Sequence, residues 1–339
     1  MWKARRYEYL LQRNGALLSI LIPAFNAATY LSTTLDSLLA QEGEDFEVVI
    51  CDDGSSDQTG NIASSYANRD SRVRYFRQEN SGASAARNAA FLAARGRWVI
   101  YFDADDLSYA GSLAAMMRVA RLHPKDVVYC RWSKFDQHSD RRIAELFSGD
   151  MAGPLWLERA FLHDYPTYNG CFVLPRSLIE EAGGWNEQLS FQDDMEFYAR
   201  VVSRVETMRF CPEAVFIYRQ GVPGSISNAP GRGGSASQYL ATTLAVQHLL
   251  SVQNTKSARV AGARQLMLVS YTQYLAAPDI SRKAEIYAKS LAAYPRPWLP
   301  GGPKRRLLQV MLGWKLALKV HAMLKILKQW QARRPAKFV

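Results

Sequence analysis

The strongest constraint on the fold is a regular alternation of short apolar runs with stretches of helical periodicity in the first hundred residues. Four runs rich in β-branched residues have the length of buried strands: residues 17–23, 46–51, 73–77 and 98–102. Three stretches with helical spacing lie between them: residues 31–39, 61–67 and 84–95. Strands that alternate with helices predict a mainly parallel sheet in a doubly wound, Rossmann-like α/β domain.

The second half of the chain begins with short elements and ends in helices. Strands are predicted at 126–131, 170–174 and 209–218, and helices at 176–182 and 193–203. A Gly/Ser/Pro-rich stretch at 221–237 predicts a mobile loop and a domain boundary. Only helical patterns follow it: residues 238–251, 258–275, 282–293 and 304–330. We therefore expect an α/β domain at 1–230 and a helical C-terminal region at 231–339.

Polar residues come directly after three of the predicted strands. Asn26 follows the first, the run Asp52-Asp53-Gly54-Ser55 the second, and the run Asp103-Ala104-Asp105-Asp106 the fourth. In open α/β sheets, ligands bind beyond the carboxyl ends of the strands. Turns also favour Asp and Gly, so a single such run would be weak evidence. Three of them at one edge of a sheet indicate a binding site.

The run from Asp103 to Asp106 has the character of a metal site. Its three carboxylates, Asp103, Asp105 and Asp106, repel one another unless a cation or hydrogen-bond donors neutralise them. Oxygen ligands of this kind suit Mn²⁺ or Mg²⁺, which bind one or two carboxylates together with substrate phosphates. The alternative is an acidic cap at the start of a helix.

Two further segments carry candidate functional residues. In residues 79–88, small residues lead into a helix that contains Arg87, whose guanidinium can bind a phosphate in a bidentate manner. Asp193 and Asp194 stand at the start of a predicted helix, where a carboxylate can act as a general base. Both aspartates could instead cap that helix, and the run that begins at Asp52 could be an Asx turn.

These segments occur in the order and approximate spacing of a known family. The sequence resembles the family-2 inverting glycosyltransferases of the GT-A fold, of the type that builds bacterial polysaccharides and other glycans. The resemblance covers residues 17–227 and rests on six segments: Ile22-Pro23-Ala24-Phe25-Asn26, Asp52-Asp53-Gly54-Ser55, Ser81-Gly82 with Arg87-Asn88, Asp103-Ala104-Asp105-Asp106, Gly183-Gly184-Trp185-Asn186-Glu187, and Asp193-Asp194.

The resemblance implies a role for each matching residue. The nucleotide sugar would be held by Pro23, Phe25, Asn26, Asp53, Ser55, Arg87, Asp103 and Asp105. Among these, Pro23, Phe25 and Asp53 would hold the base, and Arg87 would assist the nucleotide or diphosphate. Asp103 and Asp105 would hold the ribose and a Mn²⁺ or Mg²⁺ ion, with Asp106 near enough to exchange roles. Asp194 would be the catalytic base, with Asp193 next to it, and Trp185 would bind the acceptor.

One segment departs from the family pattern. Many members have a histidine shortly after a Tyr-Arg pair, whereas here Tyr218-Arg219 is followed by Gln220-Gly221-Val222. A metal would then depend on the aspartates and the diphosphate.

The expected activity is transfer of a sugar, with UDP as the expected nucleotide, to a hydroxyl of a glycan or lipid-linked acceptor. A single displacement would invert the anomeric configuration. Two other functions are weighed against it. A nucleotidyltransferase would need a Gly-rich basic loop after the first strand, which Pro23-Ala24-Phe25-Asn26 does not supply. A non-catalytic module that binds nucleotide sugars would not need Asp53, Asp105 and Asp194 intact.

The C-terminal region carries the positive charge of the chain. Residues 286–339 hold 12 of its 42 lysines and arginines and none of its 31 acidic residues, which leaves 30 basic against 31 acidic residues in 1–285. A nucleic-acid-binding protein would usually spread this charge over the folded domain, so we expect no nucleic-acid partner. Residues 304–330 predict a basic amphipathic helix that lies on an anionic membrane or, alternatively, packs on the catalytic domain.

The remaining features bear on location. No apolar stretch has the length of a signal core or a transmembrane helix, so a cytoplasmic enzyme at the membrane surface is expected. The four cysteines are scattered, and buried reduced thiols are expected ahead of zinc ligands or disulfides.

Overall fold

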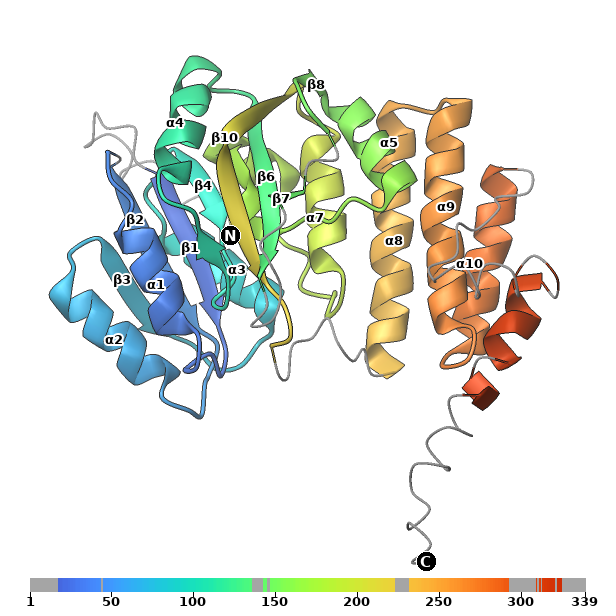
Figure 1. The fold of residues 1–339 in the computed structure, drawn as a ribbon, viewed down its shortest axis with the longest axis horizontal. Helices are drawn as coiled ribbons and strands as arrows, with labels where there is room; N and C mark the ends of the chain where they lie inside the picture. Colours follow the sequence, from blue (N-terminus) through green and yellow to red (C-terminus); the bar gives the residue numbers. More distant parts are fainter. Residues whose placement is uncertain are drawn as a thin grey trace, which may run out of the picture.

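A mixed β-sheet forms the centre of the molecule, with helices on both faces (Figure 1). The computed structural model describes residues 18–43, 45–135, 143–144, 147–222 and 232–292 and, in the C-terminal stretch, residues 309, 311, 313–320 and 322–324. The strands are β1 (Leu18–Ala24), β2 (Phe46–Asp52), β3 (Val73–Arg77), β4 (Trp98–Tyr101), β5 (Leu107–Ser108), β6 (Val127–Phe135), β7 (Ile143–Ala144), β8 (Met151–Ala152), β9 (Phe172–Pro175) and β10 (Thr207–Arg219). Their order is β3-β2-β1-β4-β9-β6-β10-β5, with β7 beside β6 and β8 beside β10.

The first half of the sheet confirms the predicted α/β pattern. Strands β3, β2, β1 and β4 are all parallel, and helices α1 (Leu31–Leu39), α2 (Thr59–Arg69) and α3 (Ala83–Ala93) alternate with them. Ala24 pairs with Asp52 in the β1–β2 register, and Leu21 pairs with Tyr101 in the β1–β4 register. The segments that follow β1, β2 and β4 therefore meet at one edge of the sheet, as predicted from the sequence.

The second half of the sheet is mixed, not parallel. β9 runs antiparallel to both of its neighbours, β4 and β6, whereas β6 and β10 are parallel. The helices of this half are α4 (Ser112–Leu122), α5 (Gly153–His163), α6 (Arg176–Ala182) and α7 (Asp193–Val202). A short 3₁₀ turn, Asn169–Cys171, precedes β9. β9 inserts between the parallel half and β6, and this insertion brings the 3₁₀ turn beside the end of β4.

The C-terminal helices stand in a row beyond α5 and α7 (Figure 1). They are α8 (Arg232–Val252), α9 (Lys256–Gln273) and α10 (Pro278–Leu291). The predicted loop at 221–237 was too long: α8 begins at Arg232, so residues 232–237 are helical. α8 also packs against α7, and buried residues of α8 and α9 belong to the same core as the sheet.

The predicted tail helix at 304–330 falls mostly outside the described residues. Residues 313–320 are helical, and the Trp314 ring lies 5.3 Å from the Tyr274 ring. Lys315 Nζ lies 2.6 Å from a Glu285 carboxylate oxygen on α10. Met323 and Leu316 are at least half exposed. This part of the tail thus both packs on the helical region and presents apolar side chains to solvent.

Two other sequence predictions concern buried thiols and membrane spans. All four cysteines are buried, and none is in a disulfide. In the described part of the chain, no helix combines the length and apolar character that crossing a bilayer requires.

Candidate active site

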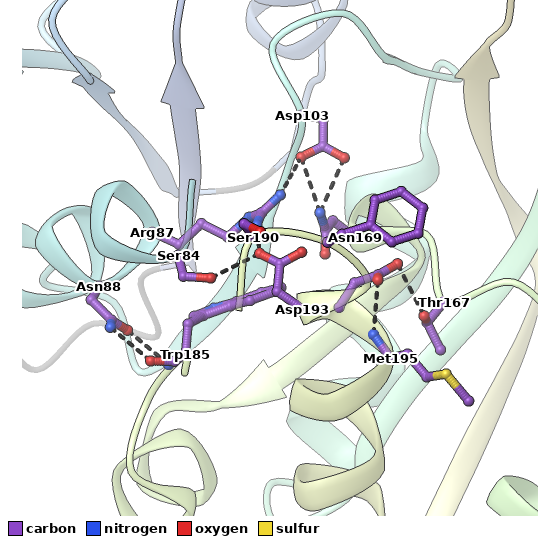
Figure 2. A network of polar contacts seen from close by, with 12 residues as sticks. Ser84, Arg87, Asn88, Asp103, Thr167, Asn169, Trp185, Ser190, Asp193 and Met195 are labelled. Carbon is purple, nitrogen blue, oxygen red and sulfur yellow. Dashed lines mark hydrogen bonds and ion pairs between the residues drawn. The ribbon is translucent and has the colours of Figure 1, made fainter. Parts of the chain in front are cut away.

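Arg87 lies at the centre of a buried polar network (Figure 2). Its side chain extends from α3, with one terminal nitrogen 2.7 Å from Asp193 Oδ2 and the other 3.1 Å from Asp103 Oδ1. The guanidinium carbon also lies 4.3 Å from the Trp185 ring centroid, a cation–π contact. Burial lowers the pKa of Arg87, but the carboxylates of Asp193 and Asp103 outweigh it and raise the pKa above its ordinary value. A permanently charged Arg87 thus joins three distant segments.

Asp103 accepts hydrogen bonds from two sides. Besides Arg87, the Asn169 side-chain amide lies 3.0 Å from both Asp103 oxygens. Asn169 is held in turn by the Tyr198 hydroxyl, which donates to its carbonyl at 3.2 Å. Asn169 was not among the residues predicted from the sequence, because an Asn-Gly pair before a strand is typical of an ordinary turn. Only the insertion of β9 beside β4 brings it to Asp103.

Asp193 and Asp194 are adjacent in sequence but have different environments. Asp193 Oδ2 accepts from Arg87 and from the Ser84 hydroxyl at 2.8 Å. Asp194 makes no ion pair among the described residues; its oxygens accept from Thr167 Oγ1 at 3.2 Å and from the Met195 backbone N–H at 2.8 Å. The N-cap is Gln192, so helix capping does not explain Asp193. Arg87 occupies Asp193 and leaves Asp194 as the more available base.

The pKa of Asp194 supports this division of roles. Burial, followed by repulsion from Asp193, raises it to about 6, although the charge of Arg87 acts in the opposite direction. A general base works best when its pKa lies close to the working pH. Asp194 therefore has the environment of a general base that is ionised at neutral pH.

Asp53 ties the end of β2 to the loop before α3. Its Oδ1 accepts from Gln78 Nε2 and the Ser81 N–H, and its Oδ2 accepts from the Gly82 N–H, each at 2.8 Å. Gly82 has a φ of 92°, which an L-residue rarely adopts. A carboxylate has about four acceptor positions, so about one remains for a ligand such as the predicted nucleobase. Asp53 thus shapes the loop from which Arg87 is presented.

The Asx-turn alternative holds for the neighbours of Asp53. Asp52 Oδ1 accepts from the Ser55 N–H at 2.8 Å, and Asp57 Oδ1 accepts from the Thr59 N–H at 2.9 Å. Ser55 and Asn26, both predicted to bind the nucleotide sugar, form hydrogen bonds between their two loops. Ser55 Oγ accepts from the Asn26 N–H at 2.9 Å, and Asn26 Oδ1 accepts from the Ser56 N–H. These hydrogen bonds hold Asn26 at a φ of 49° and connect the loops after β1 and β2.

Phe25 and Pro23 lie at the end of β1 with their side chains accessible. Phe25 is 53% exposed, whereas most phenylalanines in the described residues are buried. Pro23, near the end of the same strand, is half-buried. An exposed aromatic ring next to Asp53 can stack on a planar group.

The acidic run after β4 does not cap a helix. No helix starts within it, since β5 follows at Leu107, so the helix-cap alternative is wrong. Asp106 is buried, at 1% exposed, and its Oδ1 accepts from the Arg219 N–H at 2.9 Å. The described residues contain no group of three or more His, Cys, Asp or Glu arranged to hold a metal. A role for Asp106 as a metal ligand beside Asp103 and Asp105 stays a prediction.

Asp103 and Asp105 retain the character of a two-carboxylate site. Burial, followed by repulsion from Asp103, raises the pKa of Asp105 to about 6. Arg219 supports the turn, because its Nε donates to the Asp105 carbonyl at 2.6 Å. From the sequence, Arg219 was noted only because no histidine follows it, and its contact with Asp105 was not predicted. The donor chemistry fits a divalent cation that takes its remaining ligands from phosphate and water.

Trp185 does not have the predicted access to an acceptor. Its side chain is 3% exposed and stacks on the Phe197 ring at 4.2 Å, below Arg87. Asn88 holds its backbone, donating to the Trp185 carbonyl and accepting from its N–H. A surface hollow of about 400 Å³ is lined by α3 and the segment from Gly183 to Glu187. Burial leaves no face of the ring for a sugar. The indole instead packs against Arg87 and supports its position.

Comparisons with known proteins agree with this arrangement. Residues 19–180 match the family model for glycosyl transferase family 2. An uncharacterized glycosyltransferase, EpsJ of Bacillus subtilis, is 31% identical over 222 residues, which are 63% of this chain and 64% of the relative. An uncharacterized glycosyltransferase of Rickettsia typhi is 30% identical over 210 residues, 59% of this chain and 62% of the relative. The chain thus spans a little under two thirds of these relatives' length.

The fold also matches a solved structure. TarS of S. aureus, residues 1–349 in complex with UDP-GlcNAc, superposes with a TM-score of 0.60 at 18% sequence identity. The match covers 82% of this chain and 93% of that one, so it extends into the C-terminal helical region. The GT-A fold expected from the sequence is therefore confirmed.

The elevated pKa of Asp194 predicts an effect on stability. Its pKa of about 6 in the folded protein exceeds the ordinary 3.8 of an unfolded chain, so folding favours the protonated carboxyl. Stability from this group is present at low pH and is lost as the pH rises through about 6. We expect Asp194→Asn to raise the free energy of unfolding at about pH 8 by roughly 1–3 kcal/mol, and by much less near pH 4. Denaturant unfolding at both pH values checks this; a variant less stable at pH 8 would contradict it.

Proposed function

Because residues 19–180 match the family model for glycosyl transferase family 2, we propose that the chain is an inverting glycosyltransferase. The donor is a nucleotide diphosphate sugar, and UDP is favoured because the superposed TarS structure holds UDP-GlcNAc. The acceptor is a hydroxyl of a glycan or a lipid-linked sugar. The observation that carries this proposal is the split of Asp193 and Asp194 into one carboxylate bound to Arg87 and one with a pKa of about 6.

The proposed chemistry follows from that split. Asp194 removes the proton of the acceptor hydroxyl, and the oxygen attacks the anomeric carbon as its bond to the diphosphate breaks. A single displacement inverts the configuration, so an α-linked donor gives a β-glycoside. Asp193 holds the Arg87 guanidinium in place, so the guanidinium does not pair directly with Asp194. No covalent intermediate is required, and Asp194 has the character of a base instead of a nucleophile.

The nucleotide is proposed to bind at the parallel edge of the sheet. Phe25 and Pro23 supply accessible apolar surface at the end of β1, and Asp53 keeps one acceptor position at the end of β2. The loop that Asp53 holds leads into α3, so base recognition and the placement of Arg87 share one segment. Because these groups are held in place before the donor binds, they favour one fixed position of the diphosphate next to the acceptor.

A Mn²⁺ or Mg²⁺ ion is proposed at Asp103 and Asp105. When bound, it would stabilise the charge that develops on the leaving diphosphate. Asp103 is positioned for this by Asn169 and Arg87, and Asp105 by Arg219.

The location proposed for the enzyme is the cytoplasmic face of a membrane. In the described part of the tail, the exposed apolar side chains of Met311, Leu316, Met323 and Leu324 lie near Lys315 and Lys319. Apolar groups beside basic ones suit the surface of a bilayer that contains anionic lipids.

The catalytic base is tested by Asp194→Asn. We expect transfer from a UDP-sugar to fall by about 10²–10⁴-fold, because the amide cannot accept the proton. UDP binding, measured by calorimetry, should stay within about twofold. In the wild type, log(kcat/KM) should fall by about one unit per pH unit below about pH 6. Release of UDP with and without acceptor gives the rates, and wild-type transfer rates in the variant would eliminate Asp194 as the base.

The metal site is tested by Asp105→Asn, with Asp36→Asn on α1 as a control carboxylate outside the site. Calorimetry of Mn²⁺ binding to the UDP-saturated protein should show at least a tenfold loss of affinity for Asp105→Asn and no change for Asp36→Asn. Equal Mn²⁺ affinity in all three proteins would remove Asp105 from the site.

The membrane proposal is tested by the double variant Leu316→Ser/Met323→Ser, with Leu122→Ser as the control. Leu122 is 73% exposed on α4, far from the tail in sequence. Full-length protein should co-sediment with anionic vesicles at low salt and be released at high salt, since exposed charges are screened over about 8 Å at physiological ionic strength. The double variant should lose most of this binding and Leu122→Ser should keep it. Equal sedimentation of all proteins would refute the proposal.

A further inference from the structure

The loop before the catalytic aspartates is held by a serine from the C-terminal helical region. Ser237 Oγ on α8 accepts from the Ser190 and Phe191 N–H groups and donates to the Phe191 carbonyl, each at 3.0 Å. Ser237 is buried. One hydroxyl thus satisfies three backbone groups of a loop that ends two residues before Asp193.

The backbone between this loop and the aspartates has an unusual conformation. Gln192, the N-cap of α7, has a φ of 56°, in the left-handed region that residues other than glycine rarely adopt. Such a residue costs on the order of 1 kcal/mol and persists only where its surroundings hold it. The Thr242 hydroxyl of α8 lies 3.5 Å from the Gln192 side-chain oxygen. α8 therefore contacts the loop and the N-cap that set the direction of Asp193 and Asp194.

A third contact from α8 reaches the first turn of α7. His248 Nε2 lies 3.2 Å from Glu196 Oε1, and Glu196 is buried and ion-paired with Arg200. Arg200 donates to the Gly184 carbonyl, next to the tryptophan beneath Arg87. α8 thus contacts both the N-cap of α7, at Gln192, and the first turn of α7, at Glu196.

We propose that Ser237 is a positioning residue for the catalytic carboxylates, and that α8 is part of the active site although it lies outside residues 19–180. The inference rests on the proposed transferase function. Ser237 contacts neither substrate nor the reacting atoms; it acts by holding the loop in the conformation that separates Asp193, bound to Arg87, from Asp194. Loss of this contact lowers the fraction of molecules with Asp194 correctly placed.

The test is Ser237→Ala, with Ser235→Ala as the matched control. Ser235 is also buried on α8, but its hydroxyl donates to Gln273 Oε1 within the helical region, at 2.7 Å. We expect Ser237→Ala to lower kcat at least tenfold with KM for the UDP-sugar within twofold, and Ser235→Ala to keep wild-type kcat. Hydrogen exchange at the amides of residues 190–196 should be at least tenfold faster in Ser237→Ala than in Ser235→Ala.

The two readouts separate this inference from the proposed function. If wild-type protein neither transfers nor hydrolyses any nucleotide sugar, the proposed function fails, and the exchange rates alone decide whether Ser237 holds the loop. If the wild type is active but Ser237→Ala matches Ser235→Ala in kcat, the positioning role is overturned. Equal exchange rates at residues 190–196 in the two variants overturn it as well.

Discussion

The buried guanidinium of Arg87 sets the arrangement of most of the active site. A charge removed from water is stable only with close counter-charges, and here Asp103 and Asp193 supply them from the end of β4 and the start of α7. Satisfying that charge determines how closely these elements approach each other. Trp185, Phe197 and Tyr101 fill the space below it with stacked and edge-on rings. The same interaction therefore joins the parallel half of the sheet to the part of the chain that carries Asp193 and Asp194.

This arrangement explains how two neighbouring aspartates come to differ. Asp193 is committed to Arg87 and Ser84, so its charge is neutralised locally. Asp194 is buried beside that charge and gains only hydroxyl and amide partners, which raises its pKa to about 6. A raised pKa of this kind suits a group that accepts a proton near neutral pH. Burial of Asp194 lowers the stability of the fold, and the large apolar core compensates for this loss.

The helical C-terminal region is coupled to this site through α8. The sequence suggested a boundary near residue 230, yet Ser237 and His248 contact the loop and the first turn that carry the aspartates. The core is also continuous across that boundary. A separate second domain would have its own core and few polar contacts to the first. α8 is therefore structurally continuous with the domain that carries Asp193 and Asp194.

The sequence alone determined the parallel half of the sheet, the edge at which Asn26, Asp53 and Asp103 gather, and the helix that begins at Asp193. These features depend on local periodicity and on strand direction, which a linear pattern records. The partner of each side chain was decided only by the tertiary structure. Insertion of β9 brought Asn169 to Asp103, burial removed Trp185 from its predicted role, and Ser237 came from beyond the expected boundary. Such contacts join residues far apart in sequence, and their geometry depends on how whole elements pack, which no local pattern encodes.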